Sequence, residues 1–456
     1  MLRTGGAIAH MADMSENLVH DVIAAALKAG ADAAEAVLAE RQSLSVTVRL
    51  GELEEVEREE ARDLGVRVFI GRQQASVSAS DISPAARAKL IERVVAMARL
   101  APEDRYASLA PKDRLAKGPF PELDLFDPAE PDAAALEAEA RAAEAAARGV
   151  AGVTNSDGGS STWSASTWLY ATSDGFEGRH QASGFSLSAS AIAGEGSSME
   201  RGGEGRSQRW RADLPTAESI GAEAGRRAVA RLGARKIDST SAPVIFENRL
   251  AASLLSPLIG AIAGPSIARG TSFLKDKLGQ PVFADNVTLT EDPHRLRGLG
   301  SSPFDDEGVA NQRRALIDKG VLTTWLLNTA SARQLGLETT GHASRGLAGP
   351  PGVATTNLTL EPGDRSLAEL MADAKDGLLV TSMFGPSLNG NTGDWSVGVS
   401  GFWFENGEMA YPVTEITVAG NLIDIYRRVV VGADLEIRGA ANSPSLLIDD
   451  LAIAGR

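Results

Sequence analysis

Strand-like alternation of apolar and polar residues recurs along both halves of the sequence and limits the folds that the chain can adopt. In the first half, residues 44–50 and 66–70 place an apolar side chain at every second position, which is typical of a half-buried sheet. In the second half, glycine, asparagine and aspartate turns separate further strand-like runs. Those runs are residues 283–289, 315–326, 353–360, 377–383, 396–405, 409–422 and 445–451. So many strands with few helices predict a sandwich-like or barrel-like second half.

Helix signals frame the strands of the first half. Capping residues, apolar side chains at helical spacing or a high alanine content mark each helix. The predicted helices are residues 15–28 with Ser15 as the cap, a helix from Ser83-Pro84, residues 131–149 and residues 216–232. The two SDG sequences, Ser156–Gly158 and Ser173–Gly175, are predicted to be turns. The acidic run of residues 52–60 is predicted to be a solvated strand edge or hairpin.

The length of 456 residues exceeds what one hydrophobic core usually organises, so two domains are expected. The predicted fold class is α+β. The N-terminal α+β domain, a sheet with flanking helices, is predicted to cover residues 15–238, and the β-rich C-terminal domain residues 239–456. The boundary is placed in GARKIDSTSAP, which has the composition of a linker.

Composition excludes several classes of function. The net charge of -15 argues against a nucleic-acid partner, because affinity for the phosphate backbone comes mainly from clustered Lys and Arg. The absence of cysteine removes disulfides, thiolate nucleophiles and cysteine-containing metal sites. The first residues lack the apolar region of a signal peptide, so a cytoplasmic protein is expected, whether the true start is Met1, Met11 or Met14.

One segment, residues 246–270, has no charged side chain between Arg249 and Arg269. Roughly 20 apolar residues suffice to cross a bilayer. However, Pro257, Pro265 and several serines dilute this segment, and no second segment of its kind occurs. A buried helix is therefore predicted, with no membrane partner.

Two short motifs leave catalytic alternatives open. Ser272 and Lys275 match SxxK, in which a lysine activates a serine one helical turn away, although an incidental turn of helix is favoured. Asp305, Asp306 and Glu307 are adjacent oxygen donors for a hard cation. Consecutive residues do not converge on an ion unless the loop wraps around it, so a surface turn is predicted there.

Three long blocks of the sequence carry a resemblance to a known family. They are FDDEGVANQRRALIDKGVLTTWLLNTASARQLGLETTGHASRG (Phe304–Gly346), TTNLTLEPG (Thr355–Gly363) and GNTGDWSVGVSGFWFENGEMAYPVTEITVAGNL (Gly390–Leu422). The sequence resembles the TldD/PmbA family, and within it the PmbA (TldE) branch, over essentially the whole chain past residue 15. The resemblance implies two domains per subunit and a heterodimeric TldD/TldE metalloprotease that degrades unfolded peptides and processes leader peptides of microcins. Family members also bear the name modulator of DNA gyrase.

The resemblance also implies where a zinc site would lie. TldD-type sequences carry HExxxH on the helix before a GTS-like segment, and a distant cysteine completes the zinc site. Counting back from Gly270-Thr271-Ser272, the corresponding positions here are Leu255, Ser256 and Gly260. The expected chain is therefore a non-catalytic subunit without a cofactor of its own, paired with a TldD-like subunit that holds the zinc. Gly260 and Gly264 would form a small-xxx-small helix face, packed either inside the domain or at the subunit interface.

An unfolded peptide substrate is expected to bind by strand addition at sheet edges. The predicted contribution to the substrate cavity or the interface is the loop that holds Asn389, Asn391, Asp394 and Trp395. Alternatively, the asparagines and glycines of this loop form a hairpin turn, and Trp395 lies in the core. Two other functions remain: a homodimeric hydrolase that uses Ser272 and Lys275 or the Asp305 loop, and a regulatory binding module without a protease partner.

Overall fold

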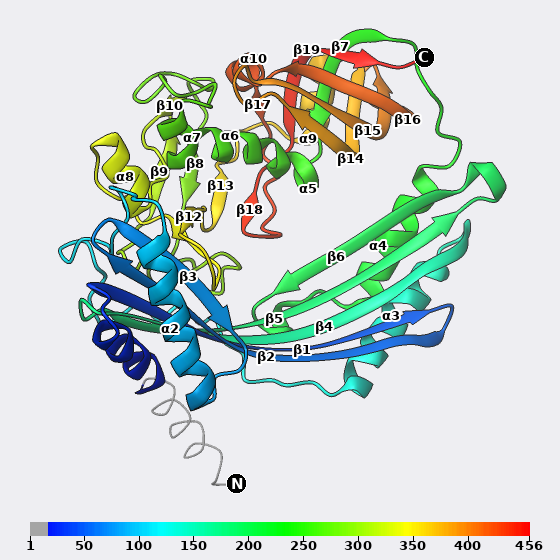
Figure 1. Ribbon diagram of the computed structural model, residues 1–456. Helices are drawn as coiled ribbons and strands as arrows, with labels where there is room; N and C mark the ends of the chain where they lie inside the picture. Colours follow the sequence, from blue (N-terminus) through cyan, green and yellow to red (C-terminus); the bar gives the residue numbers. More distant parts are fainter. Residues whose placement is uncertain (1–16) are drawn as a thin grey trace.

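The computed structural model describes residues 17–456, and its first half is built on one long, curved sheet (Figure 1). The sheet has six antiparallel strands in the order β3-β2-β1-β4-β5-β6. They are β1 (Ala33–Arg49), β2 (Glu52–Ile70), β3 (Gln73–Ala79), β4 (Val153–Thr172), β5 (Glu177–Ala193) and β6 (Glu200–Gln208). At about 3.3 Å per residue, the 20 residues of β4 span roughly 65 Å.

Helices cover one face of this sheet, which confirms the predicted α+β first half. They are residues 17–28, α2 (Pro84–Leu100), α3 (Ala133–Arg148) and α4 (Ala217–Ala230). Alternate residues of β1 point to this face: Leu38 packs with α2 and Leu44 packs with α3. Ser83 caps α2 as predicted, since its side chain accepts a hydrogen bond from the N–H of Ala86. The predicted cap Ser15 lies outside the described residues.

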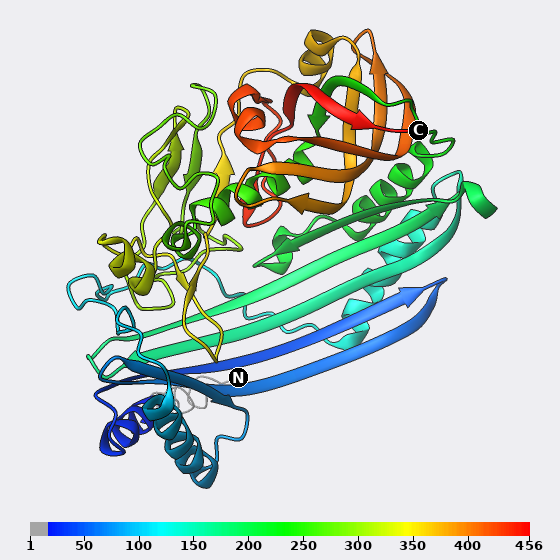
Figure 2. The same cartoon turned by 45° about the horizontal axis from the view of Figure 1, so that its top comes forward.

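The C-terminal half contains a closed five-stranded barrel, as the strand pattern predicted. Its sheet order is β16-β15-β14-β7-β19-β17. An additional β16–β19 pairing, with Val418 opposite Ile453, closes the first five strands into the barrel, and β17 pairs with β19 outside it. The strands are β7 (Thr240–Phe246), β14 (Gly377–Leu388), β15 (Asp394–Glu405), β16 (Glu408–Asn421), β17 (Val430–Val431) and β19 (Leu446–Ala454). Figures 1 and 2 both show the barrel across from the long strands of the first half.

A second, smaller sheet connects the barrel to the first half. Its strand order is β10-β9-β8-β13-β18. Strands β11 and β12 pair with each other and form a separate two-stranded sheet. These strands are β8 (Leu289–Glu291), β9 (Arg314–Asp318), β10 (Val321–Leu322), β11 (Ala343–Ser344), β12 (Gly352–Val353), β13 (Leu358–Leu360) and β18 (Ala441–Asn442). The helices α8 (Thr329–Leu335), α9 (Leu367–Ala374) and α10 (Leu422–Arg428) also belong to this half, together with the short helices of residues 248–269.

Three of the predicted strand runs are much shorter in the structure. Of residues 283–289 only Leu289 is in a strand, and residues 315–326 divide into β9 and β10 around Gly320. Of residues 353–360 only Val353, in β12, and Leu358–Leu360, in β13, are in strands. Gly320 has a φ of 80°, and an added Cβ would lie 2.6 Å from the carbonyl oxygen of Ala284. The tight turn therefore needs glycine and ends the strand earlier than alternation alone indicates.

The uncharged segment is not one helix, and this corrects the prediction. It forms α5 (Asn248–Ala251), a 3₁₀ turn (Ala252–Leu254), α6 (Leu255–Ile262) and α7 (Gly264–Arg269). The break falls at Ala263, whose ψ is 128°, just before Pro265 in the first turn of α7. Gly260 and Gly264 therefore lie on different helices. A Cβ on Gly264 would lie 2.4 Å from Oγ of Ser331 on α8, whereas Gly260 faces open space.

One of the two predicted SDG turns lies inside a strand. Ser173–Gly175 forms the β4–β5 turn, but Ser156–Gly158 is a bulge within β4, between the pairs Ser156–Ala191 and Gly158–Ser190. Gly158 has a φ of 109°, a backbone conformation that glycine also adopts in turns. In this chain it bends a long strand. Among residues 17–456, no helix has the length and apolar character to cross a membrane.

Candidate functional site

On the face of the long sheet that the helices leave uncovered, the central stretch of β1, β4, β5 and β6 carries small hydroxyl side chains and glycine. Tyr170 of β4 identifies this face, because it packs with Phe304 of the C-terminal half. We call its central part the hydroxyl face. It consists of Ser43, Ser45 and Thr47 of β1, Ser160, Thr162 and Ser164 of β4, Ser186, Ser188 and Ser190 of β5, and Gly203, Gly205 and Ser207 of β6. All twelve are half-buried or exposed.

Strand register aligns these residues in rows across the sheet. One row runs through Ser45, Thr162, Ser186 and Ser207, and the next runs through Thr47, Ser160, Ser188 and Gly205. On the outer strand β2, the rows continue as Glu57 opposite Ser45 and Glu55 opposite Thr47. The hydroxyl face is thus uncharged at its centre and acidic at its β2 edge.

The hydroxyls of this face are mostly left for solvent or a ligand. Ser45 Oγ and Thr162 Oγ1 lie 2.9 Å apart, whereas Ser186, Ser188 and Ser207 make no side-chain hydrogen bond within the described chain. Such a surface offers hydrogen bonds to a passing main chain but no deep pocket and no charge to select a side chain. The sequence signal was present in SLSVT, SSTWSAS and SGFSLSAS, where serine alternates with apolar residues. Sequence reasoning used this signal only to predict strands.

A pocket of about 300 Å³ lies beside the β6 end of the hydroxyl face. It is lined from the first half by Arg201, Gly202, Gly203, Glu223, Arg227, Ala230 and Arg231, and from the barrel half by Glu247, Arg249, Leu379, Thr381, Ser382, Phe402 and Met409. Each of its four arginines has a carboxylate partner: Arg201 pairs with Asp157, Arg227 with Glu204, Arg231 with Glu200 and Arg249 with Glu247. We call it the arginine pocket.

The positions that match the zinc motif of TldD-type sequences supply no metal ligand. Leu255 is 2% exposed in the core of the C-terminal half, whereas Ser256 and Gly260 are exposed on α6. Residues 17–456 contain no group of three histidine, cysteine or carboxylate side chains close enough to hold a metal ion. The residues present at these positions therefore do not fit a zinc ion.

The structure does not bring Ser272 and Lys275 together as a catalytic pair. Ser272 is 2% exposed, its Oγ donates a hydrogen bond of 2.6 Å to the carbonyl of Ala261 and accepts one of 2.9 Å from the N–H of Leu274. Lys275 is exposed. The serine hydroxyl thus forms its hydrogen bonds with the local backbone.

The turn with Asp305, Asp306 and Glu307 is buried, so the prediction of a surface turn was wrong. Asp305 accepts three main-chain hydrogen bonds of 2.8–3.0 Å, and Glu307 accepts one from the N–H of Thr329. Burial, and then the Glu307 carboxylate, raise the pKa of Asp305 well above its ordinary value. Burial also raises the pKa of Glu307. The carboxylates hold neighbouring loops instead of projecting into solvent.

The loop predicted to contribute to the cavity or the interface is the β14–β15 turn. Asn389, Asn391 and Asp394 lie together there and are exposed, and Asp394 accepts a hydrogen bond from Nδ2 of Asn421. Trp395 is 5% exposed and packs edge-on against Phe246 in the barrel core. The structure therefore separates the tryptophan from the three polar residues.

Three family models match the chain in succession. They are described as PmbA/TldA metallopeptidase domain 1 over residues 34–98, the central domain over residues 126–232 and the C-terminal domain over residues 239–455. Metalloprotease PmbA of Escherichia coli O157:H7 is 40% identical to this chain over 428 residues, which are 93% of each protein. The metalloprotease PmbA homolog of Haemophilus influenzae is 37% identical over 94% of each.

Solved structures share the fold. A crystal structure from Bacteroides thetaiotaomicron, described as a modulator of DNA gyrase, has a TM-score of 0.90 and 29% identity, and the match covers 97% of this chain and 99% of that one. TldE from Thermococcus kodakarensis has a TM-score of 0.84 and 21% identity over 96% of this chain and 100% of that one, which shows a likeness of fold. By its sequence and its fold, this chain belongs to the PmbA/TldD metallopeptidase family.

Proposed function

We propose that this chain is the TldE-type, zinc-free subunit of a heterodimeric metallopeptidase that cleaves unfolded peptides and peptide leaders. A TldD-like partner supplies the zinc and the catalytic base. This chain supplies part of the wall along which the peptide lies. The proposal places the pair in the cytoplasm.

The single observation that carries the proposal is the state of the zinc-motif positions in a chain that otherwise keeps the whole fold. A metallopeptidase needs imidazole or carboxylate ligands and a base beside the metal-bound water. Here the matching positions hold Leu255, Ser256 and Gly260, which offer an aliphatic side chain, a hydroxyl and no side chain at all. The bond-breaking chemistry must therefore come from another chain.

The hydroxyl face suits an extended peptide without a preferred sequence. Neighbouring strands lie about 4.8 Å apart, so a row from β2 to β6 crosses roughly 19 Å, the length of about six extended residues. Small hydroxyls along that row can exchange hydrogen bonds with the peptide as water does, so no single side chain is required. A peptide that instead runs along the open edge of β6 can pair with it through the main chain, which is equally tolerant of sequence.

The test measures cleavage of an unfolded protein by this chain alone, by a TldD-like partner alone and by the mixture, with zinc quantified in each. Cleavage is expected only in the mixture, with zinc in the partner and none in this chain. Cleavage by this chain alone would overturn the proposal in favour of a homodimeric hydrolase. Unchanged partner activity on mixing would favour a regulatory module.

A further inference from the structure

We propose that the outer edge of β2 binds an extended peptide in which basic and apolar side chains alternate. The edge consists of residues 52–63, and we call it the free β2 edge. The inference rests on the proposed function and deepens it, because it names the class of unfolded peptide that this subunit captures.

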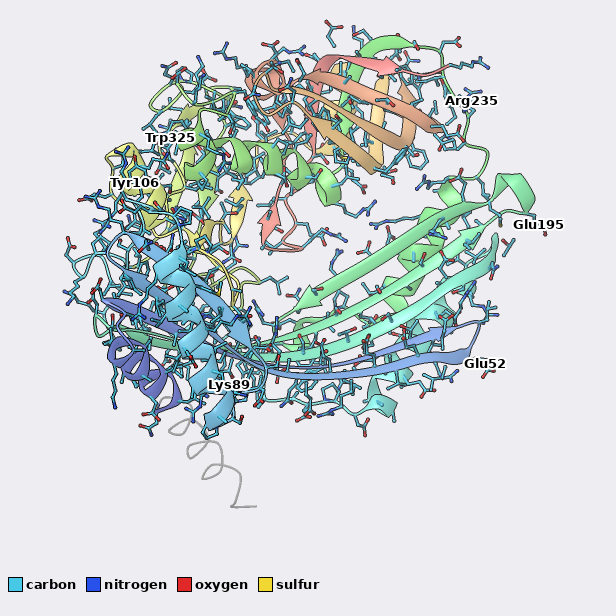
Figure 3. The ribbon with its side chains drawn as sticks, viewed as in Figure 1. Glu52, Lys89, Tyr106, Glu195, Arg235 and Trp325 are labelled. Atoms are coloured by element: carbon cyan, nitrogen blue, oxygen red, sulfur yellow. The ribbon has the colours of Figure 1, made fainter. Side chains whose placement is uncertain are left out.

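The free β2 edge has no strand neighbour among residues 17–456. β2 has 19 residues, whereas β3 has seven and pairs with β2 only from Leu64 onward. Figure 1 shows β2 continuing past the end of β3, and Glu52, labelled in Figure 3, lies at the far end of this edge. Every second residue of an edge strand turns its N–H and C=O outward, so about six residues here can pair with an added strand.

On one side of this edge the side chains are acidic. Register with β1 places Glu55, Glu57 and Glu59 on the hydroxyl face. All three are exposed, and none has an ion-pair or hydrogen-bond partner among the described residues. Arg41 shares this face but pairs with Asp63 at 3.3 Å. Basic side chains of an added strand would therefore meet carboxylates that lack a partner, whereas a second copy of this edge would be repelled.

On the helix-covered side the edge is apolar near its tip. Val46 of β1 is 0% exposed in the cluster that contains Leu136 of α3, whereas its neighbour on β2, Val56, is 48% exposed. Leu53 lies on the same side, opposite Val48, and is 45% exposed. The apolar layer under α3 thus ends uncovered at the sheet edge. An apolar side chain on an added strand would cover Val56 and extend this layer by one strand.

The two sides of the edge together define the ligand. A strand sends successive side chains to opposite faces, so one face of the added strand can be basic while the other is apolar. The ligand therefore carries Lys or Arg at every second position and aliphatic residues between them. A uniformly basic segment would place charges against Val56, and a uniformly apolar segment would leave the three glutamates without partners.

The test follows the binding of fluorescent peptides to this chain alone by anisotropy at low salt. The alternating peptide is KVKVKVK, and its control, KKKKVVV, has the same composition without the alternation. We expect the alternating peptide to bind about tenfold more tightly, the size of effect that a few cross-strand ion pairs give. N-methyl groups on two adjacent central residues of KVKVKVK remove a main-chain donor from each of its edges. This version should bind no better than the control.

Matched variants separate the free β2 edge from the general negative charge of the chain. The triple variant Glu55→Gln, Glu57→Gln and Glu59→Gln should lose the preference for the alternating peptide. The control variant removes three exposed carboxylates elsewhere: Glu92→Gln, Glu405→Gln and Glu408→Gln. It changes the net charge by the same amount and should keep the preference. Both variants replace exposed side chains, so both should unfold close to the wild type.

The absence of cysteine from the chain allows the bound peptide to be located directly. Val56→Cys and a peptide with cysteine in place of its central valine should form a mixed disulfide, because facing residues of paired strands bring their Cβ atoms within reach. Met97→Cys is the control, since Met97 is 41% exposed on α2, and it should react much more slowly.

Equal affinity for KVKVKVK and KKKKVVV, or a preference that survives in the Glu55, Glu57 and Glu59 variant, would overturn the inference. So would equal cross-linking of Val56→Cys and Met97→Cys. Displacement of the peptide by the TldD-like partner would assign the edge to the subunit interface and would also overturn it. The binding assay needs neither the partner nor cleavage, so it succeeds or fails separately from the mixing experiment. Failure of the mixing experiment alone would remove the peptidase role and leave a peptide-binding edge.

Discussion

Glu35 on β1 forms a buried ion pair with Arg345, which lies just after β11 in the C-terminal half, and their side chains are 1% and 0% exposed. The same carboxylate lies 3.2 Å from Nη1 of Arg67 and accepts a 2.7 Å hydrogen bond from the hydroxyl of Tyr170. Burial raises the pKa of Glu35, but Arg345 and Arg67 outweigh it and hold the pKa below its ordinary value. The pair joins the long sheet to the C-terminal half.

Arg345→Met should lower the free energy of unfolding by about 3–5 kcal/mol, because it leaves part of the Glu35 charge buried without its partner. Arg365→Met is the control, since Arg365 pairs with Asp373 at about half exposure, and it should cost no more than about 1 kcal/mol. Urea unfolding of both variants measures the difference. Equal effects would show that the buried pair does not hold the two halves together.

The contribution of Glu35 should also depend on pH. Its folded pKa is lowered, so the stabilisation is present above the ordinary value of 4.5 and is lost as the pH falls through the folded pKa. Unfolding of the wild type and of Glu35→Gln, followed below pH 5, should converge as the pH falls. Parallel curves would contradict the assigned direction.

Asp305 and Glu307 should show the opposite dependence. Both folded pKa values are raised, so their protons stabilise the folded state fully below the ordinary values, and that stabilisation is lost as the pH rises through the folded pKa. Glu307→Gln keeps an acceptor for the N–H of Thr329 and removes one charge. Its stability relative to the wild type should increase with pH. Thermal unfolding between about pH 5 and 9 tests this, and a constant difference would contradict it.

Local sequence patterns predicted the strands and helices whose formation depends on residues that are close together in the chain. Alternation along residues 44–50 gave a real strand, and Ser83 caps the helix that begins at Pro84. The errors arose where tertiary contacts decide. Nothing in PFDDEG indicates that Asp305 is buried and that its carboxylate accepts a hydrogen bond from the N–H of Ala343 in β11.

The site was harder to predict than the fold. The hydroxyl face exists only because register places Ser45, Thr162 and Ser186 side by side, although they are far apart in the sequence. The arginine pocket likewise combines Arg201 of one half with Arg249 of the other. The reverse holds for Trp395, which is adjacent to Asp394 in sequence yet points into the core. A strand sends neighbouring side chains to opposite faces, so the four-residue site prediction could not hold as one surface.

A bulky group on the hydroxyl face should slow peptide cleavage by the assembled enzyme. Ser186→Trp should lower kcat/KM about tenfold or more, which corresponds to about 1.4 kcal/mol, because the indole occupies the space over the row. Ser186→Ala should have little effect, since water replaces one exposed hydroxyl bond. Gln42→Trp is the control, because this exposed residue lies on β1 with its side chain on the other face. Equal losses for both tryptophan variants would contradict a role for this face.

Restoring the zinc motif should not restore a zinc site. In a variant with Leu255→His, Ser256→Glu and Gly260→His, the two histidines are five residues apart, about 140° around α6. The first would point into the core, where Leu255 is 2% exposed, and the second would point to open space. We expect no stoichiometric zinc by elemental analysis and a loss of about 2–5 kcal/mol from the core substitution.

The matched control keeps Leu255 and carries only Ser256→Glu and Gly260→His, both at exposed positions. It should unfold close to the wild type, apart from the helix propensity that replacing glycine adds. One zinc per chain in the triple variant, with unchanged stability, would show that α6 turns both histidines to one point. That result would show that three substitutions alone account for the missing zinc ligands of this chain. It would also contradict the view that the fold of this subunit no longer accommodates the metal.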